Sequence, residues 1–137
     1  MNHWLLKSEP ASYSWEQLVK DGRTNWNGVR NPQATNNLKA MKKGDRTFFY
    51  HSNEGLAIVG IAEIVKEFYP DPADKSGRYG MVDIAPVMAL KTPVTLAAVK
   101  ADPRFHDLAL VRLSRLSVSP VSAEHWKLLC SMGGVKG

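Results

Sequence analysis

The stretch Arg46–Phe68, RTFFYHSNEGLAIVGIAEIVKEF, decides the fold class. Two runs rich in aromatic and β-branched residues flank the turn-forming residues 53–55, and this pattern predicts a β-hairpin. The second run, from Leu56 to about Phe68, is apolar on both faces as far as Ile61. A continuous apolar run without helical breaks is typical of a strand that is buried on both sides, as in a closed barrel.

Further strand signals lie on both sides of this hairpin. Besides residues 46–52 and 56–68, we expect strands at residues 3–7, 79–90 and 115–119. Pro86 lies within one of them and implies a sheet edge or a bulge, because proline cannot donate a ladder hydrogen bond. Residues 25–30 and 70–78 are expected to be loops.

Three residues that can cap a helix N-terminus, Ser14, Asn31 and Ser122, mark the main expected helices. Another short helix is expected at residues 95–100. The expected inward-facing residues are Trp15, Leu18 and Val19 in the first helix, Ala34, Leu38 and Met41 in the second, and Trp126, Leu129 and Cys130 in the last. These elements predict an α+β fold with a curled sheet of five or six strands and flanking helices.

Length and composition are those of one domain, spanning residues 1–137. The net charge of +5 suits a nucleic-acid partner but sets only non-specific attraction. No run approaches the roughly 20 apolar residues of a membrane span, and residues 1–7 do not resemble a signal peptide. We therefore expect a cytoplasmic protein without membrane association. The single cysteine, Cys130, cannot form an internal disulfide and is expected to be buried.

Signals for catalysis are weak. The sequence contains no phosphate-binding loop, nucleophile elbow, dinucleotide fingerprint or zinc-protease motif. Its four histidines lack the spacing of metal ligands, so we expect no metal and no cofactor. His51 and Ser52 are neighbours on an expected strand, where they point to opposite faces and cannot form a direct catalytic pair.

Two polar stretches remain as candidates for a site, and the first ends the expected strand 3–7. Lys7 and Glu9 lie on one face of the chain there, and Ser8 lies on the other. The two charged residues either form a solvated ion pair worth less than about 1 kcal/mol or line a polar pocket. The residues alone leave both alternatives open.

The second stretch is residues 26–31, WNGVRN. A tryptophan in a loop of asparagine and glycine is poorly explained as core, and its ring can stack on a base for roughly 1–3 kcal/mol. The alternative is that Trp26 plugs one end of the barrel and Arg30 pairs with a carboxylate. Residues 50–53, at the end of the aromatic strand, add stacking surface and hydrogen-bonding groups nearby.

These stretches carry a resemblance to a known family. The sequence resembles the EVE domain, of the PUA-like superfamily that also contains the YTH and ASCH modules. The matching segments, in chain order, are residues 4–10 (WLLKSEP), 26–31 (WNGVRN), 36–38 (NNL), 50–53 (YHSN), 59–62 (VGIA), 71–72 (DP), 115–118 (RLSV) and Pro120. The sequence departs from the family pattern at Thr35, where a basic residue is more common, and at Met81, where tryptophan is.

The resemblance implies a mixed β-barrel with a pocket at one end that binds modified bases such as 5-methylcytosine derivatives. On this sequence it assigns Lys7, Ser8 and Glu9 to the pocket rim, Trp26, Val29, Arg30 and Asn31 to a loop over the base, and Tyr50, His51, Ser52 and Asn53 to the wall.

The leading hypothesis is a non-catalytic module that accepts a modified base of DNA or RNA already unpaired or flipped from a duplex. Asn31, Ser52 or backbone groups would read the base edge, and Lys7 or Arg30 a phosphate. The alternative is a small PUA-like hydrolase that acts on a modified nucleoside, with Lys7 and Glu9 as base and acid. We expect a monomer or a weak homodimer in either case.

Overall fold

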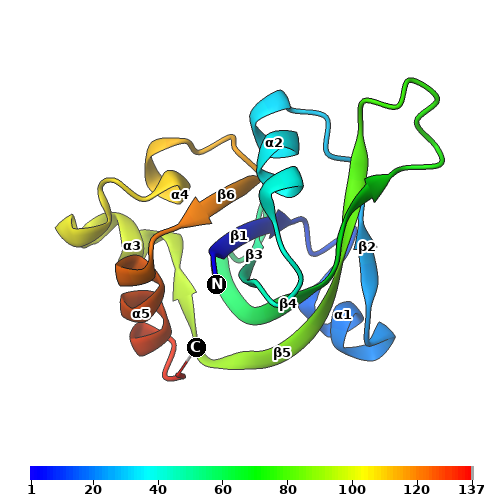
Figure 1. Cartoon of the computed structure of the whole chain (residues 1–137). Coiled ribbons are helices and arrows are strands. Elements are labelled where there is room, and N and C mark those ends of the chain that lie inside the picture. Colours follow the sequence, from blue (N-terminus) through cyan, green and yellow to red (C-terminus); the bar gives the residue numbers. More distant parts are fainter. Residues whose placement is uncertain (137) are drawn as a thin grey trace.

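One mixed sheet of six strands, in the order β2-β5-β4-β3-β1-β6, organises the chain (Figure 1). The computed structural model describes residues 1–136. The strands are β1 His3–Ser8, β2 Thr24–Trp26, β3 Arg46–His51, β4 Ala57–Pro70, β5 Gly80–Thr95 and β6 Val118–Val121. β1 runs parallel to β3, and all other neighbours are antiparallel. The mixed α+β sheet is therefore confirmed.

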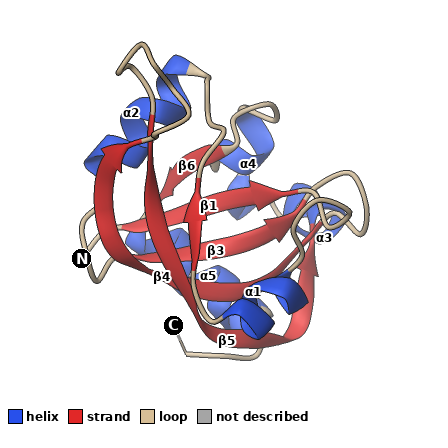
Figure 2. Cartoon of the chain, turned by 90° about the vertical axis from the view of Figure 1, so that its right-hand side faces the viewer, coloured by secondary structure: helices blue, strands red, loops and turns tan. Residues whose placement is uncertain are grey.

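The sheet curls strongly but is not closed (Figure 2). β4 and β5 are 14 and 16 residues long, and four shifts in their mutual register let them bend around the core. Within residues 1–136 the two edge strands, β2 and β6, pair with β5 and β1 and not with each other. The closed ring expected from the apolar run in β4 is thus corrected to an open, barrel-like sheet. β2 and β6 are therefore the two open edges of the sheet.

Within residues 1–136 five helices flank the sheet, and three of them start at the expected caps. They are α1 Trp15–Asp21, α2 Pro32–Ala40, α3 Leu96–Ala101, α4 Ala109–Arg112 and α5 Ala123–Met132. The side chains of Ser14, Asn31 and Ser122 each accept a hydrogen bond from the backbone N–H three residues on. The short helix α4 and the 3₁₀ turn Pro103–Phe105 lie between the expected helix at residues 95–100 and the expected strand at residues 115–119.

Two hydrophobic clusters pack against opposite faces of the sheet. The first contains Leu6 and Phe49 and packs under α1 and α2; the second contains Leu5 and Phe48 and packs under α3, α4 and α5. Neighbours in β1 and β3 fall into different clusters because side chains alternate across a strand. Of the expected inward-facing residues, only Val19 is wrong, since 53% of it is exposed.

Two strand details differ from the local sequence pattern. Residues 24–26 form β2, although residues 25–30 were expected to be loop, because they pair with Val82–Ile84 far along the chain. Pro86 lies inside β5, beyond the part that β2 covers, and next to a register shift in the pairing with β4. The expected edge or bulge at this proline is therefore confirmed.

Candidate functional site

A hollow of about 470 Å³ opens where β1 ends and the chain leaves β2. It is lined by Lys7, Ser8, Glu9, Ser12, Trp26, Asn27, Gly28, Val29, Arg30 and Ser117. We refer to it as the Lys7 hollow. It brings together six of the eleven residues that the sequence predicted for the site, and these come from both predicted stretches, Lys7–Glu9 and 26–31.

Lys7, at the rim of the Lys7 hollow, is held by the segment that precedes β6. The Nζ of Lys7 donates a 2.7 Å hydrogen bond to the carbonyl of Ser114, and its backbone N–H donates to the carbonyl of Ser117. Burial lowers the pKa of Lys7. Because an ammonium has three donors, the bond to Ser114 occupies only one of them. Among residues 1–136 no ion pair joins Lys7 to Glu9, so the structure does not contain the simple rim pair.

Ser8 is a buried structural residue of this rim. Its hydroxyl donates a 2.5 Å hydrogen bond to the carbonyl of Tyr13, and its own carbonyl accepts from the N–H of Ser52. The turn between them is closed by the carbonyl of Glu9, which accepts from the N–H groups of Ser12 and Tyr13. Glu9 is exposed, and these bonds fix its backbone beside the hollow that it lines.

Trp26 ends β2 and is half-buried at the wall of the hollow. Its ring makes edge contacts with Phe49, at 5.6 Å and 78°, and with Tyr13, at 6.3 Å and 80°. The indole is therefore anchored on the first core cluster and also lines the hollow. Gly28, with a φ of 80°, then reverses the chain in a conformation that a residue with a Cβ rarely adopts.

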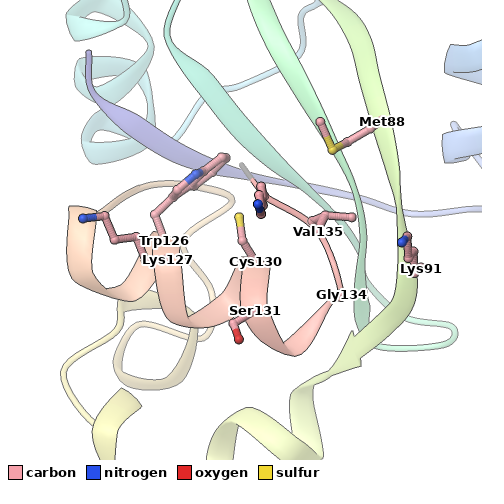
Figure 3. A pocket seen from close by; sticks show the side chains of 9 residues that line it. Met88, Lys91, Trp126, Lys127, Cys130, Ser131, Gly134 and Val135 are labelled. Atoms are coloured by element: carbon pink, nitrogen blue, oxygen red, sulfur yellow. The ribbon is translucent and has the colours of Figure 1, made fainter.

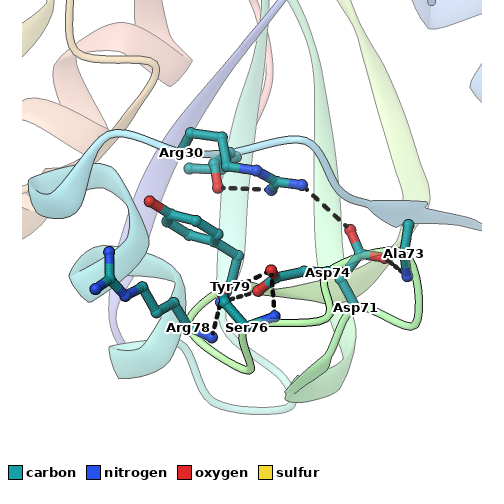
Figure 4. A network of polar contacts seen from close by, with 8 residues as sticks. Arg30, Asp71, Ala73, Asp74, Ser76, Arg78 and Tyr79 are labelled. Carbon is teal, nitrogen blue, oxygen red and sulfur yellow. Dashed lines mark hydrogen bonds and ion pairs between the residues drawn. The ribbon is translucent and has the colours of Figure 1, made fainter.

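Arg30 is held by the loop between β4 and β5 (Figure 4). Its guanidinium lies 3.9 Å from the Asp71 carboxylate, 4.6 Å over the Tyr79 ring, and 3.2 Å from the carbonyl of Val29, which accepts its hydrogen bond. The loop is itself closed by Asp74, whose carboxylate accepts from the N–H of Tyr79 at 2.8 Å. The pairing of Arg30 with a carboxylate, left open by the sequence, is present.

The structure does not bring the other five predicted residues into the Lys7 hollow. Asn31 uses its side-chain oxygen to cap α2, accepting from the N–H of Ala34 at 3.0 Å. It lines a separate hollow with Gln33 and residues 113–116. Ser52 and Asn53 lie in the turn after β3 and outside the residues that line the Lys7 hollow.

Tyr50 packs on the opposite face of the sheet from Trp26. It is 2% exposed and belongs to the second core cluster, whereas Trp26 packs against the first. Burial raises the pKa of Tyr50. The expectation that Tyr50 forms a wall with Trp26 is corrected, because Phe49 is the residue of β3 that faces the indole. Tyr50 instead supports Lys7, whose Nζ lies 5.9 Å from its ring centre.

His51 has a structural role at the start of α1. Its Nε2 accepts a 3.1 Å hydrogen bond from the backbone N–H of Trp15. Burial lowers the pKa of His51, against a smaller opposing effect of the Glu16 carboxylate. This ring nitrogen is thus already occupied as an acceptor, and the residue cannot use it as a general base without breaking the contact with α1.

Sequence reasoning missed four residues of the lining, namely Ser12, Asn27, Gly28 and Ser117. Asn27 and Gly28 lie inside the segment 26–31, so their position beside Trp26 was the available signal. Ser117 precedes β6, and only the pairing of β6 with β1 brings it to the rim.

A larger hollow, of about 870 Å³, lies elsewhere, against α5 and β5 (Figure 3). It contains Met88, Trp126 and Cys130 among its lining, with Lys91 and Lys127 at its edges, and none of the predicted site residues. Within residues 1–136 no three His, Cys, Asp or Glu side chains gather as a metal site would require. No helix in that range has the length and apolar character needed to cross a bilayer.

Known proteins with this architecture include three informative structures. A protein from Rhodopseudomonas palustris is 59% identical, with a TM-score of 0.94 over 98% of this chain and 94% of that one. The human THYN1 protein in complex with 5-methylcytosine-containing DNA is 33% identical, with a TM-score of 0.89 and full coverage of both chains. The YTH domain of Zygosaccharomyces rouxii MRB1, solved with N6-methyladenosine RNA, shares only the fold. Its TM-score is 0.62 at 17% identity, over 96% of this chain and 86% of that one.

The family model of the EVE domain matches residues 2–132, nearly the whole chain. That match agrees with the open PUA-like sheet and with the segments that carried the resemblance. The chain belongs to the EVE domain family.

Proposed function

We propose that this domain is a non-catalytic nucleic-acid-binding module that holds one unpaired base of the 5-methylcytosine type in the Lys7 hollow. The observation that carries the proposal is that Lys7, Glu9 and Trp26, from two separate segments of the chain, line one hollow. The human THYN1 protein, which has the same fold and a third of its residues in common, was solved with 5-methylcytosine-containing DNA. The hollow of about 470 Å³ lies within the range of about 300–1,000 Å³ that is usual for ligand sites.

The lining has groups complementary to a cytosine ring. The Glu9 carboxylate can accept from the exocyclic amine, a pairing also used in major-groove recognition. The Lys7 ammonium can donate to the ring acceptors, and Trp26 can stack on the ring. Val29, buried beside them, supplies an apolar surface for the 5-methyl group. Lys7 and Glu9 therefore replace Asn31 and Ser52 as the proposed readers of the base edge.

Arg30 serves in this proposal to position the loop over the base rather than to bind a phosphate. The supporting contacts are its ion pair with Asp71 and its stacking on Tyr79. The phosphates of the nucleic acid would be contacted by exposed lysines and arginines, whose excess over acidic residues gives the net charge of +5.

The free energy of burying one methyl group limits the preference for 5-methylcytosine over cytosine. Flipping a base costs a few kcal/mol, and stacking returns roughly 1–3 kcal/mol of this. Burying one methyl group contributes about 0.8 kcal/mol, which corresponds to about a fourfold preference. A larger preference requires that the unmodified base leave a gap next to Val29, since such a gap forfeits van der Waals contacts.

A fluorescence-anisotropy titration tests the proposal. Single-stranded oligonucleotides that differ only in one cytosine or 5-methylcytosine are compared on the wild type, on Trp26→Ala, and on Lys127→Ala as a control in the other large hollow. We expect at least fourfold tighter binding of the methylated strand, and a tenfold or greater loss in Trp26→Ala alone. If both strands bind with equal affinity and Trp26→Ala loses no affinity, the binding is non-specific and the proposal is wrong.

The proposal also covers the type of nucleic acid that is bound, the oligomeric state and the cellular compartment. We propose that the domain acts as a monomer or a weak homodimer in the cytoplasm, on DNA or RNA strands. Matched deoxy and ribo oligonucleotides separate the two, because a ribose 2′-OH adds a donor and an acceptor at each contact. Sedimentation of the free domain and of its complex measures the oligomeric state, and fractionation of cells measures the compartment.

A further inference from the structure

A second hollow shares a wall with the Lys7 hollow. It measures about 370 Å³ and is lined by Ser8, Ser12, Tyr13, Thr24, Asn25, Trp26 and Asn27. We refer to it as the Tyr13 hollow. Four of its residues, Ser8, Ser12, Trp26 and Asn27, also line the Lys7 hollow. The indole of Trp26 is thus common to both.

The two hollows differ in their chemistry. Lys7, Glu9 and Arg30 give the Lys7 hollow three charged groups. The lining of the Tyr13 hollow, within the part of the chain that the structure describes, consists of hydroxyl, amide and aromatic side chains without a charge. Neutral donors and acceptors next to aromatic rings suit the edge and the face of an unstacked nucleobase.

The residues that line the Tyr13 hollow are held in place by strand pairing and by side-chain contacts. Thr24, Asn25 and Trp26 belong to β2 and are paired with β5. The ring of Tyr13 contacts Trp26 edge-on, and its hydroxyl donates a 2.8 Å hydrogen bond to Asp21 of α1. The hydrogen-bonding groups of this hollow are therefore presented by a strand and a braced ring, which favours a formed site over a chance surface depression.

From this arrangement we infer that the Tyr13 hollow binds the base adjacent to the modified one on the same strand. The inference rests on the proposed function of the Lys7 hollow. Successive bases of one strand rise by about 3.4 Å in a duplex, and a side chain inserted between them widens this step. Two hollows that share the Trp26 wall match such a separated pair. The unit that the domain recognises is then a dinucleotide, and the neighbour of the modified base contributes to specificity.

An abasic scan on the wild-type domain tests the inference. The strand carries 5-methylcytosine at a fixed position, and one abasic residue is placed directly 5′, directly 3′, or about five nucleotides away. We expect the abasic residue on one adjacent side to weaken binding five- to tenfold more than the distant one. Equal effects at all three positions would overturn the inference.

Protein variants test whether the Tyr13 hollow is the site that binds the neighbouring base. The neighbour on the sensitive side is varied among the four bases, and the spread of dissociation constants is measured for wild type, Thr24→Val and Thr92→Val. Thr24→Val keeps the shape of the side chain but removes the hydroxyl from the Tyr13 hollow; Thr92 is exposed and lines neither hollow. We expect a spread of at least fivefold in the wild type and in Thr92→Val, and a reduced spread in Thr24→Val.

The two proposals fail separately. If the wild type prefers 5-methylcytosine but binds all neighbours equally, the second base site is wrong and the Lys7 hollow proposal stands. If the wild type does not distinguish 5-methylcytosine from cytosine, the proposed function itself is wrong. A spread that persists unchanged in Thr24→Val also contradicts the inference, because the neighbour is then read elsewhere.

Discussion

Arg30 touches three groups of its own chain, and its contacts predict how it acts. If Arg30 positions the loop by its ion pair with Asp71, Arg30→Gln and Asp71→Asn weaken binding of a methylated strand to a similar degree. A partly exposed pair is worth about 0.2–1 kcal/mol, so each loss is expected to be up to about fivefold. The double variant should lose no more than either single one, since coupled residues are not additive.

A different result is expected if Arg30 binds a phosphate of the nucleic acid. A phosphate contact by Arg30 would make Arg30→Gln weaken binding while Asp71→Asn strengthens it, because the competing carboxylate is removed. Titrations of all four proteins at one salt concentration distinguish the two roles.

His51 predicts a pH dependence of stability. Its Nε2 must be unprotonated to accept from Trp15, and burial lowers its pKa below the ordinary histidine value of 6.5. The unfolded state therefore binds more protons than the native state just below about pH 6.5, and the free energy of unfolding falls as the pH falls through that range. The stabilising contribution is complete above the unfolded pKa.

His51→Gln checks this, because the glutamine oxygen can still accept from Trp15 without titrating. Urea unfolding at about pH 7.5 and about pH 5.5 should show a smaller loss of stability in His51→Gln than in the wild type. The exposed His106→Gln serves as the control and should keep the wild-type loss. An unchanged loss in His51→Gln would show that His51 does not carry the effect.

The segments that carry the family resemblance predicted much of the lining of this candidate site. Lys7, Glu9, Trp26, Val29 and Arg30 line one hollow as the motifs implied, because the segments 7–9 and 26–31 each keep their residues together. Tyr50 could not be placed by motif alone. Because side chains alternate between the two faces of β3, either Phe49 or Tyr50 can face Trp26. Only the tertiary packing decides which of them does.

At the scale of elements, the contact of α1 with β4 predicts a sharp steric effect. A Cβ built on Gly60 would lie 2.6 Å from the ring of Trp15, which is buried. Gly60→Ala should therefore destabilise the domain by about 1–3 kcal/mol, the usual range for overpacking.

A double-mutant cycle identifies the cause. Trp15→Leu creates space at the same place, so Gly60→Ala should cost less in that background than in the wild type, by about 0.5–3 kcal/mol. Urea unfolding of the four proteins measures the difference. Strict additivity would contradict the close approach of Trp15 to Gly60.

The elements whose signals are local were predicted well. The caps at Ser14, Asn31 and Ser122 and the turn at residues 53–55 depend on neighbours in sequence. β2 was missed because three residues carry no periodicity and their pairing partner in β5 is about 60 residues away. The open edge of the sheet was missed for the same reason.

At the scale of the whole molecule, the excess of 18 basic over 13 acidic residues predicts a salt-dependent affinity. On single strands the logarithm of the binding constant should fall with the logarithm of the salt concentration, by about 0.7 per phosphate contacted. The ratio of affinities for 5-methylcytosine and cytosine should stay constant, because stacking and methyl burial release no counterions. Titrations at about 50 mM and about 200 mM salt measure both quantities. A ratio that shrinks as salt rises would mean that selectivity is electrostatic.

The position of the modified base is the central claim, and intermolecular nuclear Overhauser effects from an isotope-labelled 5-methyl group test it most directly. In the complex with a methylated single strand, the methyl protons should show contacts with the methyl groups of Val29 and with the ring of Trp26. Contacts with Val135 and Met88 of the other large hollow, in place of Val29 and Trp26, would contradict the account.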